Sequence, residues 1–321
     1  MSTPIHDLPA ELAMDKDGRS PAEKWDRESS RRALDELFSV ARRYNSSKAY
    51  LELMQLIGRF RSYSPFNAML IHTQMPGARF AATARRWHRE FGRQIKVEAR
   101  PLVILQPMGP VLFVFDVTDT DRLPGALPLP PSIEDPFGVI AGEVGNQFEQ
   151  TIENAKRDGV SVTERGDGSQ RAGSIQAVAL GGDMEMPTAK RPQSVLEPIL
   201  RRYELILNSK LSRESRYATL VHELGHLYCG HLGTLDPKLW PDRRGLPIEL
   251  REFEAESICY LVCARLGLDN PSAEYLAGYV RHHETTPPIS LDAVMKAAWL
   301  IEQMGRSGLP MRKNQTDVPM N

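Results

Sequence analysis

The stretch that decides the fold is TLVHELGHLYCGH, residues 219–231, which contains the pattern HExxH from His222 to His226. Apolar residues at helical spacing surround the pattern, and Ser212 or Ser215 can cap a helix that leads into it. Histidines four positions apart on a helix lie on one face, about 40° apart. The stretch therefore predicts a helix whose two imidazoles reach a single metal ion.

Two histidines with an acidic third ligand are a set typical of catalytic zinc, which keeps a fourth position open. Glu223 adjoins the first histidine without facing the metal, where it could act as general base toward a water that the metal activates. This pattern predicts hydrolysis. A metzincin would have Gly and His three and six positions after His226, but Cys229 and Leu232 stand there. His231 lies about 140° off the ligand face, and we interpret it as a helix-end residue favoured by the helix dipole.

The third ligand is expected from a second helical stretch, residues 248–266, which Gly267 ends. Glu252 and Glu256 share one otherwise apolar face of this helix, and a buried carboxylate needs a cation or an N–H partner. We assign Glu252 as the third ligand and Glu256 as the acceptor that orients a ligand histidine; exchanging the two roles is an alternative. Glu254 points the other way and is expected to be solvated.

Two features beside the predicted metal helix stay open. The strand expected at residues 203–208 is either an edge strand, onto which a peptide could add, or a plain structural strand. Several residues could stabilise an oxyanion: Tyr228, Tyr260, Tyr279, His282 and His283.

The domain organisation follows from length and proline content. A chain of 321 residues is long enough for two domains, and five prolines between residues 123 and 138 prevent a helix or a central strand there. The predicted fold class is α+β: a basic α+β domain with a hairpin over residues 102–116, then a mainly helical, zincin-like domain with a small sheet. The predicted bounds are a flexible N-terminus (1–28), a first domain (29–122), a linker (123–138), a second domain (139–307) and a disordered tail (308–321).

The charge is segregated along the chain. Forty basic and 41 acidic side chains leave a net charge of −1, but residues 42–100 contain twelve Lys or Arg against three Glu, a net charge of +9. Aromatic side chains are interleaved with the cations of residues 59–100. Cations that follow phosphates and aromatic rings that stack on unpaired bases suit single-stranded nucleic acid.

The sequence predicts a cytoplasmic protein with no membrane partner. No run of about 18 apolar residues exists, and the N-terminus is polar and acid-rich rather than basic and then apolar. Three cysteines are an odd number, and all fall in apolar helical contexts, so we expect buried thiols rather than disulfides.

Residues 60–107, with YSPFN at 63–67, Trp87 and a Gly92-Arg93-Gln94 turn, resemble the N-terminal domain of the ArdC-type antirestriction family. TLVHELGHLYCGH followed by EFEAES (252–257) resembles that family's C-terminal half, a metallopeptidase domain similar to the ImmA/IrrE group. The resemblance covers roughly residues 30–118 and 140–300. It implies a first domain that binds single-stranded DNA and a zincin-like second domain with His222, Glu223, His226 and Glu252 at the metal. Its expected DNA contacts are Arg61, Tyr63, Asn67, Arg85, Arg86, Trp87 and Arg93.

The sequence therefore leads to one main expectation of function and two alternatives. The first is a zinc-dependent metallopeptidase fused to a single-stranded-DNA-binding domain, with Zn²⁺, or Mn²⁺ or another divalent ion, and a protein or peptide substrate. A second is a non-catalytic antirestriction protein that protects incoming single-stranded DNA, with zinc structural. A third is a protease that cleaves a transcriptional repressor.

Overall fold

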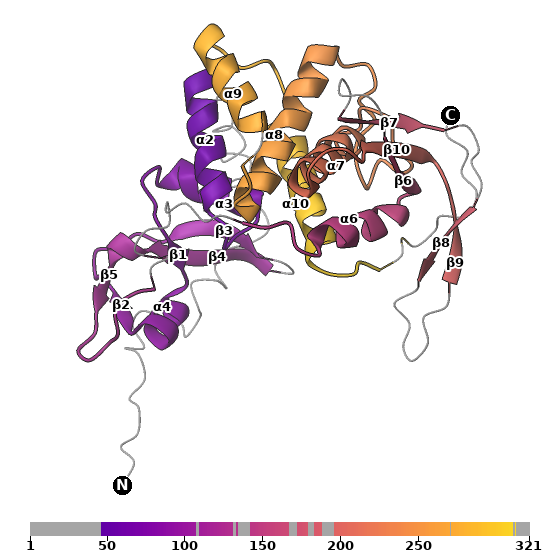
Figure 1. The fold of residues 1–321 in the computed structure, drawn as a ribbon. Coiled ribbons are helices and arrows are strands. Elements are labelled where there is room, and N and C mark those ends of the chain that lie inside the picture. The colour runs from indigo at the N-terminus through magenta and orange to yellow at the C-terminus, as the bar shows by residue number, and fades with distance from the viewer. Residues whose placement is uncertain are drawn as a thin grey trace. The chain divides into compact units, whose positions relative to one another are not determined.

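The computed structural model describes residues 46–106, 109–130, 133, 142–166, 172–178, 183–187, 196–269, 271–310 and 312 (Figure 1). These residues form two compact units: one contains those between 69 and 136, the other those from 46 to 68 and from 142 onward. Both units combine helices with short sheets, so the fold class is α+β, as predicted. The predicted flexible N-terminus (1–28) lies outside the described residues, and the predicted linker (123–138) is described only in part.

The unit between residues 69 and 136 contains a three-stranded sheet of order β1-β4-β3 and a separate pair, β2-β5. The predicted hairpin is confirmed, since β3 and β4 pair antiparallel with Leu102 opposite Val114. The elements of this unit are β1 (Ala81–Ala82), α4 (Ala84–Phe91), β2 (Arg93–Ile95), β3 (Leu102–Gln106), β4 (Gly109–Asp116), the 3₁₀ helix η4 (Val117–Asp119) and β5 (Thr120–Arg122).

Trp87 of α4 is at the centre of the core of this unit. Its side chain is completely buried and packs with Ala82 and Ile133. Its indole N–H donates to the carbonyl of Phe115 in β4 at 2.8 Å, and its ring meets Phe80 edge-on. The helix is therefore fixed with its tryptophan inward and its arginines toward solvent.

The other unit contains a second three-stranded sheet, in which β10 is the central strand. It runs parallel to β6 and antiparallel to β7. The edge-strand interpretation of residues 203–208 is thus wrong, because both hydrogen-bonding edges of β10 are already paired. The strands of this unit are β6 (Val160–Arg165), β7 (Gly173–Ala177), β10 (Tyr203–Asn208) and the pair β8 (Asp183–Pro187) and β9 (Leu196–Leu200).

Helix α8 is the centre of the helical part of this unit, where it packs against α2, α7, α9 and α10 (Figure 1). The helices are α2 (Ser47–Arg59), α6 (Gln147–Lys156), α7 (Arg213–Tyr228), α8 (Ile248–Leu266), α9 (Pro271–His282) and α10 (Leu291–Arg306), while α3 (Pro65–Gln74) crosses between the units. In the described part of the chain, no helix is both long and apolar enough to cross a bilayer.

Helix α2 belongs with the second unit, although the sequence placed it in the first domain (29–122). Tyr50 of α2 donates its hydroxyl to Ser257 of α8 at 2.7 Å, and the buried guanidinium of Arg265 donates to the carbonyl of Ile57. The apolar face of α2 is therefore covered by α8, some 200 positions later in the chain.

The start of the predicted disordered tail (308–321) is anchored. The backbone N–H of Leu309 donates to Asn154, and Arg312 donates to the completely buried Asp158 at 2.6 Å. A buried carboxylate requires a cation or N–H partners, and Arg312 is such a partner for Asp158. Positions 311 and 313–321 lie outside the described residues.

Candidate metal centre

The HExxH segment lies on α7, which begins as the sequence predicts. The hydroxyl of Ser212 accepts the backbone N–H of Ser215 and so caps the helix. Leu220, Val221 and Leu224 are completely buried, which fixes the rotation of the helix about its axis. This packing directs the two histidines away from the core and toward α8.

Helices α7 and α8 approach each other closely at Gly225, where even a Cβ atom would just touch α8. A Cβ atom at this position would lie 3.4 Å from the side chain of Ile258 and 3.5 Å from the backbone of Ala255. Because no side chain separates the helices there, the carboxylate of Glu252 comes within reach of His222, one turn before the glycine.

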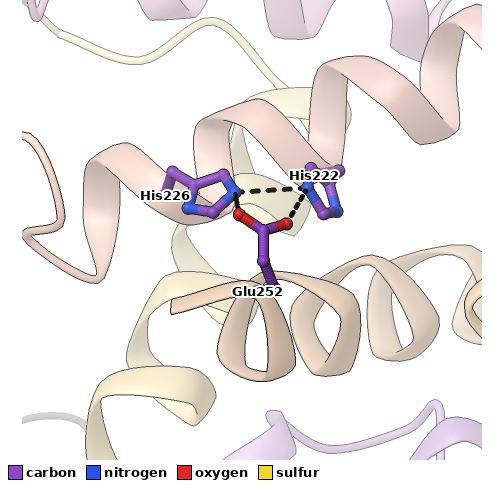
Figure 2. Close-up of side chains that lie close together, drawn as sticks. All are labelled: His222, His226 and Glu252. Carbon is purple, nitrogen blue, oxygen red and sulfur yellow. Dashed lines mark hydrogen bonds and ion pairs between the residues drawn. The ribbon is translucent and has the colours of Figure 1, made fainter. Parts of the chain in front are cut away.

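The three predicted ligands converge, as Figure 2 shows. The Nε2 atoms of His222 and His226 lie 3.2 Å apart. The two oxygens of the Glu252 carboxylate face one histidine each: Oε2 lies 3.5 Å from Nε2 of His222, and Oε1 lies 3.5 Å from Nε2 of His226. Donors around a tetrahedral zinc ion, with bonds of about 2.0–2.1 Å, are separated by about 3.3 Å. The donor set and its spacing therefore fit a divalent metal ion.

The contact between His222 and Glu252 shifts the pKa values of both groups, in opposite directions. Burial acts to lower the pKa of His222, but the hydrogen bond to Glu252 and the charge of Glu256 outweigh it and raise that pKa to about 9. The same contact with His222, followed by that with His226, holds the pKa of Glu252 far below its usual range. Without a metal ion, the site therefore holds a proton on His222 at neutral pH.

Glu223 is half-buried beside this cluster and is not one of the three donors. Burial raises its pKa, which the charges of His222 and His226 partly oppose. Its carboxylate also accepts the backbone N–H of Ile175 in β7. The arrangement presents a carboxylate of raised basicity next to the place where a metal ion would sit.

Glu256 lies on the other side of the His222 ring, with Oε1 3.6 Å from Nδ1. Glu252 faces both imidazoles, whereas Glu256 faces one, on the nitrogen that points away from the donor cluster. This geometry favours the assignment of Glu252 as ligand over the exchanged one.

Two predictions beside the site are wrong. Glu254, expected to be solvated, is completely buried, because Arg243, His231 and Ser290 enclose its carboxylate. His231, expected at the end of the ligand helix, lies beyond it: α7 ends at Tyr228, and Gly230 turns the chain at φ +81°. This turn brings the His231 ring back beside His226, and the Nδ1 atoms of the two rings are 3.0 Å apart.

Arg243 contacts the buried Glu254, and the sequence did not indicate this role. Its guanidinium donates to both oxygens of Glu254, at 2.7 and 2.6 Å. His231 Nε2 lies 2.9 Å from the same carboxylate, which also accepts the backbone N–H of Ser290 at 2.7 Å. The closeness of His231 to His226 in sequence was a usable signal, but Arg243 lies in a loop without one.

The candidates for oxyanion stabilisation separate in the structure. Tyr228 is unsuitable, since it is buried and donates its hydroxyl to Asp158. Tyr275, which the sequence analysis did not name, is partly exposed on α9, and its pKa is raised by burial and then by the charges of Glu256 and Glu252. Among the tyrosines that the structure describes, its pKa is the one raised by both Glu252 and Glu256.

Three expected DNA contacts lie in the unit that contains the metal centre. Arg61 donates to the carbonyl of Ala264 at the end of α8, at 3.0 Å. The carbonyl of Tyr63 accepts from Arg265, and the backbone N–H of Asn67 donates to a side chain at the start of α3. Arg61 makes its contact through its side chain, whereas Tyr63 and Asn67 make these contacts through the backbone. A role in DNA binding stays a prediction for all three.

Of the other expected DNA contacts, Trp87 cannot stack on a base in this structure, because its ring is completely buried. Arg93 is engaged with both the hydroxyl and the carbonyl of Thr120. Arg85 is exposed, and Arg86 is paired with Glu90 at 2.8 Å on the exposed face of α4. The surface of α4 is thus cationic but not aromatic.

Comparison with known proteins gives weak likenesses. No known protein-family model matches the chain. An uncharacterized protein of Bacillus anthracis is 22% identical over 80% of this chain and 47% of its own length, so the chain spans about half of that relative. Two crystal structures of the antirestriction protein ArdC from plasmid R388, metal-free and Mn(II)-bound, are 15% and 16% identical. Each covers 76% of this chain and 82% of its own, with TM-scores of 0.31 and 0.32, which do not establish a common fold.

Proposed function

We propose that the protein is a divalent-metal hydrolase, with zinc held by His222, His226 and Glu252 and with a peptide bond as its substrate. The observation that carries this proposal is the convergence of the three donors at tetrahedral spacing. Hydrolysis, rather than a structural metal, is favoured by Glu223, a carboxylate beside the donors that is not itself needed as a ligand.

Each side chain has a distinct task in this proposal. A divalent ion would supply Lewis acidity and lower the pKa of a water at its open position. Glu223 would act as the general base toward the attacking water and then return the proton to the leaving amine, roles that its raised pKa suits. The N–H of Ile175 would orient Glu223, and Tyr275, whose pKa is raised in part by the charges of Glu256 and Glu252, is our proposed donor to a developing oxyanion.

The substitution Glu223→Gln tests the hydrolase. The full-length variant should bind zinc as the wild type does, while cleavage of fluorescein-labelled casein and of a quenched random peptide library falls about 10²–10⁴-fold. Glu249→Gln, at the exposed start of α8, is the matched control and should leave cleavage unchanged. Equal cleavage by Glu223→Gln and the wild type would sink the assignment of Glu223.

The second candidate is a non-catalytic antirestriction protein in which the metal supports the fold. This candidate corresponds to the two crystal structures named above, which are of an antirestriction protein. Protection of an unmodified plasmid during transfer into a restricting host separates the two. Protection that persists in Glu223→Gln would favour the non-catalytic function, and protection that is lost with cleavage would favour the enzyme.

We further propose that the exposed face of α4 binds single-stranded DNA in the cytoplasm. Arg85, Arg86 and Arg89 are exposed on this short helix, and the Arg86 guanidinium is held over the rings of Phe80 and Phe91. Cations fixed on a helix suit contact with phosphates. Three free, buried cysteines fit the reducing compartment.

Salt-dependent binding tests the DNA proposal. Each lost phosphate contact lowers the log–log salt slope for single strands by about 0.7, so Arg85→Ala with Arg89→Ala should lower it by about 1.4. Fluorescence anisotropy with a labelled oligonucleotide measures the slope. The pair Arg281→Ala and Lys296→Ala, exposed in the other unit, removes the same charge and should have a smaller effect. Equal effects of the two pairs would argue against a site on α4.

A further inference from the structure

The two metal-directed histidines differ in what holds the far side of each ring. His222 turns its Nδ1 toward Glu256 at 3.6 Å, near the surface. His226 turns its Nδ1 toward another imidazole, that of His231, at 3.0 Å. An imidazole that binds a cation through Nε2 must carry its proton on Nδ1, so the partner of Nδ1 decides whether His226 is ready to bind.

Contact between two imidazole nitrogens requires one donor and one acceptor, and the surroundings of His231 determine which is which. Its Nε2 lies 2.9 Å from Glu254, whose ionised carboxylate can only accept. His231 therefore carries its proton on Nε2 and offers a lone pair at Nδ1. The proton in the contact then belongs to Nδ1 of His226, so in the neutral tautomer the lone pair of His226 lies on Nε2, which faces His222 and Glu252.

The buried carboxylate of Glu254 is kept ionised by its own partners. Arg243 donates to both oxygens, and the backbone N–H of Ser290 donates to one of them. Side chains of His231 and Glu254 have exposures of 1% and 0%, so water cannot replace any of these contacts. Cys229, the other titratable group of this cluster, is a buried thiol whose pKa is raised well above its usual value by burial, so it stays neutral.

Local backbone contacts hold the chain of side chains in place. The N–H of Arg243 donates to the carbonyl of Gly230 at 2.9 Å, and its guanidinium reaches the carbonyl of Cys229 at 3.3 Å. The N–H of His231 donates to the carbonyl of His226 at 3.0 Å. The loop that carries Arg243 is thus bonded to the same turn that carries His231.

We propose that Arg243, Glu254 and His231 form a positioning chain that keeps the proton of His226 on Nδ1 and its Nε2 free for the metal ion. The inference rests on the proposed metal centre, and it assigns these three residues to preparing one ligand rather than to filling the core. If His231 only filled space, any side chain of similar shape could replace it. The positioning role instead requires a hydrogen-bond acceptor toward His226 and a donor toward Glu254.

Two substitutions separate these roles in the full-length protein. His231→Leu keeps an apolar volume but offers neither acceptor nor donor, and it should weaken zinc binding about 10–100-fold. His231→Gln offers an amide oxygen and an amide N–H at a separation similar to that of the ring nitrogens, and it should restore most of that loss. Competition with a chromophoric zinc chelator measures the affinity. His282→Leu, at an exposed position on α9, is the control and should bind zinc as the wild type does.

Nitrogen NMR of ¹⁵N-histidine-labelled wild type gives a readout that needs no variant to fold. We expect Nδ1–H for His226 and Nε2–H for His231, both without metal and with zinc. The opposite tautomers, or a folded His231→Leu that binds zinc as tightly as the wild type, would overturn the positioning chain. Failure of the metal centre itself looks different: His222→Ala would then bind zinc as well as the wild type.

Discussion

Metal binding at this site is predicted to depend on pH over an unusual range, because the metal-free cluster holds a proton that the ion must displace. Contacts with Glu252 and Glu256 outweigh burial and raise the pKa of His222 to about 9. Only the unprotonated imidazole binds a metal ion, so each pH unit below that pKa weakens the apparent affinity about tenfold. Apparent zinc affinity should therefore rise about 50-fold from pH 7 to pH 9 and level off above pH 9, about 100-fold above its value at pH 7. A histidine with the usual pKa of about 6.5 would level off near pH 7.

Competition with a zinc chelator of known pH dependence, between about pH 6 and pH 9.5, measures this curve on the full-length protein. Glu256→Gln removes the negative charge beside His222 without removing any of the three donors, so its curve should level off at a lower pH. Glu249→Gln changes the same charge at the exposed start of α8 and should leave the curve in place.

The result that refutes this reasoning is an affinity that does not change between pH 7 and pH 9 in the wild type. A plateau at the same pH in Glu256→Gln and the wild type would likewise contradict the assigned cause of the raised pKa. In the absence of metal the sign reverses: the raised pKa of His222 contributes stability that is fully present below about pH 6.5 and lost as the pH rises through about 9.

Three further predictions concern stability and are measured by urea denaturation followed by far-UV circular dichroism. Gly230→Ala should destabilise by about 3 kcal/mol, since φ is +81° and a Cβ would lie 1.8 Å from the carbonyl oxygen of Pro241; an unchanged midpoint would contradict the described turn. Trp87→Ala should cost about 3–5 kcal/mol by emptying the core of its unit, and a loss below about 1 kcal/mol would argue against its burial. Arg265→Met should lower the free energy of unfolding by about 3–5 kcal/mol, because it leaves the buried carboxylate of Glu302 without its cation. Adding Glu302→Leu should recover part of that loss. Losses of the two single variants that simply add in the double variant would refute the pairing.

Much of the metal helix and its partner could be predicted because their signals are local. Ser212 caps α7 as its sequence position suggests, and Gly267 ends α8 in the left-handed conformation at φ +81°. Spacing along two helices then placed His222, His226 and Glu252 on faces that could meet. What the spacing could not supply was the close approach of the two helices, which the structure shows beside Gly225.

The surroundings of the metal ligands were not predictable from helical periodicity. A rule that expects one buried face fails on α8: Glu254 is enclosed by Arg243, His231 and Ser290, although it lies opposite Glu252. His231 was misplaced because α7 ends earlier than expected, so helical angles no longer apply to it. Charge counting along the sequence failed for a related reason: the basic segment is divided between two units, since α2 packs on α8.

That division has a consequence for how the protein is made and cut. During synthesis, α2 leaves the ribosome about 200 residues before α8, the helix that will cover it. The hydrogen bond from Tyr50 to Ser257 therefore cannot form until α8 has emerged. A protease that nicks the chain within residues 123–138 would not release a self-sufficient C-terminal half, because such a fragment lacks α2 and bares one side of α8. The two pieces should instead stay together after cleavage, and separating them should require denaturant.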